Sequence, residues 1–125
     1  MRSVILVGHG DGCLGMKQSA ESILGEQSNL TAVSLGMSEG MESYVSRLER
    51  TISEQEQSGF NEWLILSDIK GGTPSNVATL VAKKSSTIHV VSGYHLAMIL
   101  TACTNEMILP DDLIQETTQM IQKII

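Results

Sequence analysis

A histidine held between two glycines follows a short apolar run near the start of the chain. The run is Val4-Ile5-Leu6-Val7, and Gly8-His9-Gly10 comes directly after it. Four unbroken apolar residues bounded by turn formers are typical of a strand buried on both faces of a parallel sheet. His9 is therefore expected at the carboxyl end of a strand, where open α/β sheets carry their binding and catalytic groups.

A second polar cluster follows another apolar run, Trp63–Ser67. Asp68 comes next, ahead of the turn Gly71-Gly72-Thr73-Pro74-Ser75. If the two strands are neighbours, His9 and Asp68 face each other across the crevice at their carboxyl ends. A carboxylate that accepts a hydrogen bond from one ring nitrogen leaves the other nitrogen free to act as a nucleophile. The turn adds backbone amides, hydroxyls and a helix N-terminus, which all suit phosphate oxygens.

These residue types predict phosphoryl transfer through a phosphohistidine, with His9 as nucleophile and Asp68 as its hydrogen-bonding partner. A plainer alternative is that Asp68 only caps the following turn. The chain has no Walker lysine motif and no acidic pair placed for Mg²⁺, so another protein or a small phosphorylated donor is expected to supply the phosphoryl group. No metal or cofactor is expected. The candidate phosphoryl-binding residues are Gly10, Gly71, Gly72, Thr73 and Ser75, and the candidate rim residue is His95.

The elements that must position these residues alternate between strands and helices. The apolar runs predict strands over Ser3–Val7, Leu30–Leu35, Trp63–Ser67 and Thr87–Val91. Helical spacing predicts helices over Lys17–Leu24, Met41–Gln55, Pro74–Lys84 (with Thr73 as N-cap), Leu96–Cys103 and Pro110–Ile125. This alternation predicts an α/β fold with a single open, mainly parallel sheet of order 2-1-3-4 and helices on both faces. We expect one domain over residues 1–125.

Composition narrows the classes of partner. The net charge of −6 argues against nucleic acid, which needs a basic footprint, and against anionic membranes. The two cysteines, Cys13 and Cys103, make neither a disulfide framework nor a metal spacing, so buried thiols in a reducing compartment are expected. No signal peptide is visible, and no apolar stretch approaches the ~20 residues needed to span a bilayer. A cytoplasmic protein is therefore predicted.

At these residues the sequence resembles a known family, the IIA domain of the mannose-class (mannose–fructose–sorbose) sugar phosphotransferase system. The resemblance covers essentially the whole chain, and its paired glycine-rich segments are specific in combination. The matching segments are Gly8-His9-Gly10, Ser19-Ala20-Glu21 with Ile23-Leu24-Gly25, Leu64-Ile65-Leu66-Ser67-Asp68, Gly71-Gly72-Thr73-Pro74-Ser75-Asn76 and, more loosely, Gly93-Tyr94-His95-Leu96-Ala97-Met98.

The resemblance implies a phosphotransferase that acts in phosphoenolpyruvate-dependent sugar uptake. His9 would receive a phosphoryl group from the phosphocarrier protein HPr and pass it to a histidine of a IIB component. Asp68 would be its hydrogen-bonding partner, and Thr73 would stand near the phosphoryl group. The resemblance also implies a homodimer that works with the membrane subunits IIC and IID, which select the sugar. Some members exchange a C-terminal strand, but the helix predicted to reach Ile125 does not favour that here.

Two departures from the family pattern concern the rim of the site. His95 and Ala97 stand where the family usually has Asn and Pro, and Gly12 replaces a larger apolar residue. We expect an altered rim and a more mobile loop after His9. A regulatory module that senses phosphorylation and an anion-binding module without chemistry remain open alternatives. A histidine phosphatase is disfavoured, because Gly8 rather than Arg precedes His9.

Overall fold

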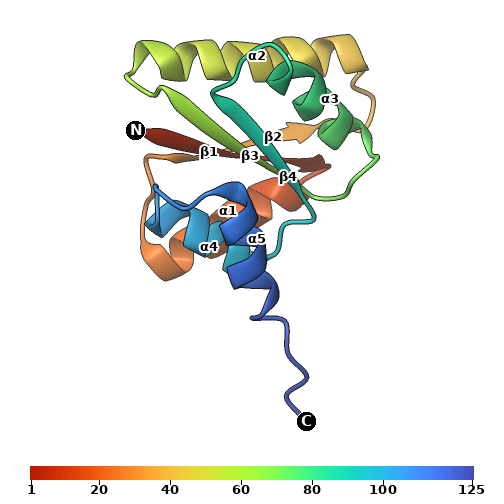
Figure 1. The fold of residues 1–125 in the computed structure, drawn as a ribbon. Helices are drawn as coiled ribbons and strands as arrows, with labels where there is room; N and C mark the ends of the chain where they lie inside the picture. The colour runs from red at the N-terminus through yellow and green to blue at the C-terminus, as the bar shows by residue number, and fades with distance from the viewer.

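Four strands form one open, fully parallel sheet in the computed structural model, which describes residues 1–125 (Figure 1). Their order is β2-β1-β3-β4, so β1 is central and β2 and β4 are the edges. This confirms the predicted α/β fold and strand order. The strands are β1 Arg2–His9, β2 Leu30–Leu35, β3 Glu62–Ser67 and β4 Ile88–Ser92.

Helices cover both faces of the sheet, as the alternation predicts. Figure 1 shows α2 and α3 on one face and α1, α4 and α5 on the other. None of these helices combines the length and the hydropathy that crossing a bilayer requires. The helices are α1 Gly12–Leu24, α2 Met41–Gln57, α3 Thr73–Ala82, α4 Leu96–Thr104 and α5 Pro110–Thr118.

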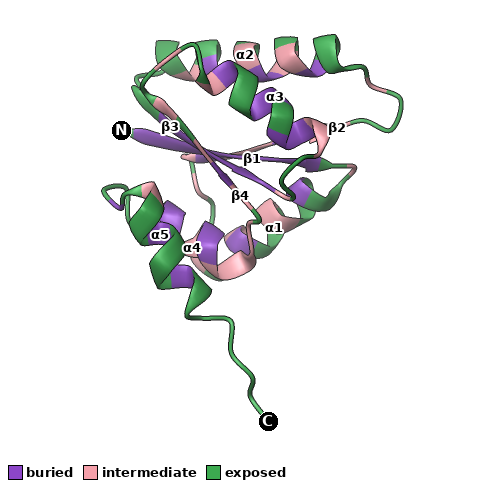
Figure 2. Ribbon diagram, turned by 45° about the vertical axis from the view of Figure 1, so that its right-hand side comes forward, coloured by how far each residue is buried: buried purple, intermediate pink, exposed green.

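The central strand divides the interior into two apolar cores. Val4 and Leu6 of β1 pack on the side of α1, α4 and α5. Ile5 and Val7 pack on the side of α2 and α3, because successive side chains of a strand point to opposite faces. All four side chains are fully buried, and Figure 2 shows buried residues lining both sides of the sheet. The continuous apolar run of β1 follows from this double burial.

Two predicted helix boundaries are wrong. The first helix begins at Gly12 rather than Lys17, directly after the turn that follows β1, and it buries Cys13 against the sheet. The last helix ends at Thr118 rather than Ile125, and the chain then leaves the body of the molecule (Figure 1). Ile121 and Ile124 are 68% and 97% exposed, since no element lies opposite them. An apolar stripe favours a helix only where it has something to pack against.

A buried arginine joins the start of the sheet to the end of α4. The Arg2 guanidinium donates hydrogen bonds to the carbonyl oxygens of Ala102, Asn105 and Ile108, at 3.4, 3.1 and 2.6 Å. A helix C-terminus leaves carbonyls without partners, and a cation is favourable there. Arg2 thus fixes the turn between α4 and α5 against β1.

Candidate functional site

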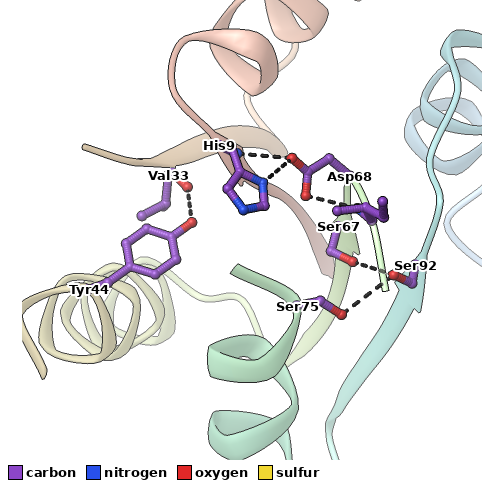
Figure 3. A network of polar contacts seen from close by, with 8 residues as sticks. His9, Val33, Tyr44, Ser67, Asp68, Ser75 and Ser92 are labelled. Carbon is purple, nitrogen blue, oxygen red and sulfur yellow. Dashed lines mark hydrogen bonds and ion pairs between the residues drawn. The ribbon is translucent and has the colours of Figure 1, made fainter. Parts of the chain in front are cut away.

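His9 and Asp68 meet at the carboxyl edge of the sheet (Figure 3). His9 is the last residue of β1, and Asp68 directly follows its neighbour β3. Nδ1 of His9 lies 2.8 Å from Oδ2 of Asp68, and the backbone amide of His9 donates to the same oxygen at 2.9 Å. The sequence prediction that topology would bring these two side chains together is confirmed.

The hydrogen bonds around Asp68 favour its charged form. Burial alone would raise the pKa of this carboxyl group. The hydrogen bonds donated by the His9 amide, the His9 ring and the Ile69 amide outweigh that effect, so the pKa lies below its ordinary value. Because a carboxylate only accepts, Nδ1 of His9 carries the proton and Nε2 keeps its lone pair. The His9 side chain is 51% exposed, against 26% for Asp68, so the nitrogen with the free lone pair belongs to the more accessible residue.

Helix α3 begins beside the His9 ring. Its cap position is Gly72 rather than the predicted Thr73, which is the first helical residue, and Pro74 stands in the first turn. The first intrahelical bond at this end runs from the amide of Asn76 to the carbonyl of Gly72, at 3.0 Å. The amides of Thr73 and Ser75 have no carbonyl one turn earlier to bind. They form an N-terminus of the kind that attracts anions.

The glycines after His9 and Asp68 form the turns on either side of the site. Gly10 and Gly71 have φ of 57° and 89°, in the region that disfavours side chains. The Gly10 amide donates to the carbonyl of Leu35 at 3.0 Å. Gly10, a candidate phosphoryl-binding residue, therefore has its backbone donor engaged with β2 and contributes the turn itself.

Ser75 is buried and belongs to a cluster of three hydroxyl groups. Its Oγ lies 3.4 Å from Oγ of Ser92, which lies 2.8 Å from Oγ of Ser67. Figure 3 shows the Ser75 hydroxyl directed at Ser92. The cluster ties the first turn of α3 to the ends of β3 and β4. Sequence reasoning missed Ser67 and Ser92, although both end strands of a parallel sheet.

Gly8 and Tyr94 complete the surroundings of Asp68, and sequence reasoning missed both roles. A methyl group placed on Gly8 would lie 3.1 Å from Oδ2 of Asp68 and 3.2 Å from the Tyr94 hydroxyl. The backbone of β1 therefore lies against both oxygens. Burial, with the nearby Cys13 and Asp68, raises the pKa of Tyr94 to about 12, so this hydroxyl stays neutral beside the carboxylate.

His95, the candidate rim residue, is engaged elsewhere. It caps α4, and its Nε2 lies 2.9 Å from the carbonyl oxygen of Thr117 in α5. Since a carbonyl only accepts, the ring nitrogen donates. The side chain thus joins the start of α4 to the last turn of α5, and this hydrogen bond leaves Nε2 unavailable to a group bound at His9.

The fold and the paired residues define a class: an open α/β protein with an oriented histidine at a strand end, beside a helix N-terminus. Comparison with known proteins specifies it further. The family model for the PTS system fructose IIA component, EIIA-man, matches residues 3–123. The chain belongs to this family, the mannose-class IIA components of the sugar phosphotransferase system, which confirms the resemblance predicted from the sequence.

Individual relatives agree with the family assignment. The fructose-specific EIIA component of Bacillus subtilis (strain 168) is 31% identical over 124 residues, 98% of this chain and 84% of that protein. The sorbose-specific EIIA component of Lacticaseibacillus casei is 30% identical over 102 residues, 82% of this chain and 72% of that protein. The solved mannose/sorbose specific IIA subunit from Enterococcus faecalis has a TM-score of 0.85 at 29% identity, covering 99% of this chain and 95% of that one.

Proposed function

We propose that this chain is a phosphocarrier of sugar uptake in which Nε2 of His9 holds the phosphoryl group. The donor is phospho-HPr, and the acceptor is a histidine of a IIB component. The observation that carries the proposal is the 2.8 Å contact between Nδ1 of His9 and Asp68, which leaves the lone pair of the other ring nitrogen free on a half-exposed side chain. Family membership supports the same reading.

Phosphoryl transfer from the donor histidine to His9 requires no proton to move. The lone pair of Nε2 forms the new P–N bond, while the P–N bond of the donor breaks and its electron pair returns to the donor imidazole. The His9 ring becomes an imidazolium that still donates from Nδ1. The carboxylate of Asp68 stabilises this positive ring, as carboxylates do beside catalytic histidines. Transfer to the IIB histidine runs the same steps in reverse.

The N-terminal turn of α3 is the proposed seat of the phosphoryl oxygens. Gly71, Gly72 and Thr73 contribute backbone amides, and Thr73 adds its hydroxyl. Charge accumulates on these oxygens during transfer, and preorganised amides at a helix N-terminus stabilise it. Ser75 contributes its amide, while its hydroxyl anchors the turn to Ser92.

The proposal extends to location and assembly. We propose one IIA domain over residues 1–125 that acts in the cytoplasm as a homodimer, together with membrane subunits IIC and IID. The free thiols of Cys13 and Cys103 suit a reducing compartment. The unpaired edge of β4 and the exposed apolar residues after Thr118 are surfaces that a second copy can cover. The net charge of −6 argues against a nucleic-acid partner.

Phosphoryl transfer to His9 is the direct test. The protein is incubated with phosphoenolpyruvate, Enzyme I and HPr, and an acid-labile adduct is sought by intact mass and peptide mapping. We expect His9→Ala to abolish the adduct and His89→Ala, which changes an exposed histidine of β4, to keep it. Asp68→Ala removes hydrogen bonds to a charged group worth about 1.5–3 kcal/mol, so transfer should slow about tenfold to a hundredfold.

Two other outcomes separate the alternatives. No adduct in the presence of active HPr would contradict the carrier proposal and favour an anion-binding module. An adduct that is never passed to a IIB component, but that changes binding to a transcriptional partner, would favour a regulatory module.

A further inference from the structure

The backbone conformation at residue 72 does not require a glycine. Its φ of −77° and ψ of 163° are extended values that every L-residue adopts freely. The obstacle to a side chain comes from the neighbouring imidazole. A methyl group placed on Gly72 would lie 2.7 Å from Cε1 of His9, 3.2 Å from Nε2 and 3.3 Å from Cγ2 of Ile69.

The His9 ring is thus confined from two sides. Asp68 holds Nδ1 at 2.8 Å, and the backbone of Gly72 lies close to the Cε1 and Nε2 side of the ring. Rotation about χ2 of histidine has a broad energy profile, so one hydrogen bond leaves the ring free to rock. The main chain of Gly72, one bond length behind the position of that methyl group, limits this motion on the Cε1 side and with it the direction of the Nε2 lone pair.

The space that a methyl group on Gly72 would fill is also space beside the reactive nitrogen. Nucleophile and phosphorus must approach to about 3–3.5 Å in line before the bond forms. A methyl carbon 3.2 Å from Nε2 would crowd the incoming group as well as displace the ring. The missing side chain therefore serves orientation and access together.

We propose that Gly72 is a positioning residue for phosphoryl transfer: by lacking a side chain, it lets the start of α3 hold the His9 ring and leaves room for a phosphoryl group on Nε2. This inference rests on the proposed function. It adds a role that the Gly72 amide alone does not provide, because an amide donor is retained when glycine becomes alanine.

Gly40 offers a matched control within the same chain. It occupies the cap position of α2, as Gly72 does of α3, and its φ of −78° and ψ of 162° are nearly the same. A methyl group on Gly40 meets nothing within 4 Å. Gly40→Ala and Gly72→Ala thus make the same chemical change at equivalent backbone positions and differ in whether the new methyl group meets His9.

The experiment compares these two variants with the wild type. Thermal unfolding checks that each variant folds. Long-range ¹H–¹⁵N NMR spectra report the His9 ring without phosphorylation, and rapid quenching with phospho-HPr gives the transfer rate at saturation and the KM. We expect Gly40→Ala to match the wild type. Gly72→Ala should shift the His9 ring signals and slow transfer about tenfold to a hundredfold, with little change in KM, as misplacement of reacting groups does.

Each result has a distinct meaning. Equal ring signals and equal rates in Gly72→Ala and Gly40→Ala would overturn the inference. If Gly72→Ala does not fold, nuclear Overhauser contacts between the Gly72 Hα atoms and Hε1 of His9 in the wild type decide instead: their presence supports the inference, and their absence overturns it. If the wild type never takes up a phosphoryl group, the proposed function fails, while the ring signals still test whether Gly72 orients His9.

Discussion

Asp68 accepts three hydrogen bonds, and they link the site to the pH dependence of stability. Because its pKa is lower in the folded chain than the ordinary value of 3.8, its contribution to stability is present above that value. The contribution is lost as the pH falls through the lower, folded pKa. We therefore expect the stability difference between wild type and Asp68→Asn to shrink as the pH drops from 7 to 3. Urea unfolding of both proteins at several pH values measures this difference in the free energy of unfolding. A difference that stays constant with pH would contradict this account.

Gly8 is the second glycine at the site whose missing side chain matters. Gly8→Ala would press a methyl group against the Asp68 carboxylate and the Tyr94 hydroxyl, and overpacking of this kind costs about 1–3 kcal/mol. We expect lower stability in urea unfolding and slower phosphorylation of His9. Gly15→Ala is the control, since its methyl group meets open space in α1 and should stabilise by about 0.5–1 kcal/mol. Equal effects of the two changes would contradict the contact.

At the scale of residues, the sequence could predict which side chains meet at the edge of the sheet but not how they are held. His9 and Asp68 follow from a general rule, that the carboxyl ends of neighbouring parallel strands share one edge. The roles of Gly8 and Gly72 depend on which side chains fold over them, and no spacing along the chain records that. His95 also follows a strand, but its ring turns to the Thr117 carbonyl of a helix far along the chain.

At the scale of elements, Arg2 joins β1 to the end of α4 through three hydrogen bonds. Arg2→Met keeps much of the buried apolar stem and removes the donors to three carbonyl oxygens. We expect destabilisation of roughly 2–4 kcal/mol, because the carbonyls lose charged donors inside the protein. His9 should still be phosphorylated, since Arg2 lies at the opposite end of β1. Arg50→Met, an exposed change in α2, serves as the control; a similar loss there would rule out this explanation.

All four strands were predictable to within two residues. The two inner strands, β1 and β3, are buried on both faces and have continuous apolar runs. The edge strands β2 and β4 are only partly buried, and their β-branched and apolar residues marked them instead. The ends of the helices were predicted less accurately. The glycines between Asp11 and Gly15 suggest a loop, yet the helix starts at Gly12, where its first turn places Cys13 against the sheet. The apolar residues after Thr118 continue a helical stripe, but the fold provides no surface for them. Where a helix ends depends on its neighbours as much as on its own sequence.

At the scale of the whole molecule, the last seven residues stand apart from the fold. All seven residues are exposed, and changes at exposed positions usually alter the free energy of unfolding by no more than about 0.5 kcal/mol. Deletion of residues 119–125 should therefore leave the stability of the isolated monomer within about this range. Unfolding of full-length and truncated chains at several protein concentrations measures this. A concentration-dependent midpoint lost on truncation would show that the segment joins subunits. A large loss at low concentration would show instead that it packs on its own chain.

The central position of β1 also determines when the site can form. β1 is made first during synthesis, yet both strands that flank it come later, and Asp68 is the 68th of 125 residues. A growing chain therefore carries His9 without its partner until more than half of the protein has been made. During that time the apolar run of β1 has no finished sheet to enter, which is the condition that calls for chaperones. The pairing of His9 with Asp68 therefore waits for β3, and the helices and strand that complete both cores are made later still.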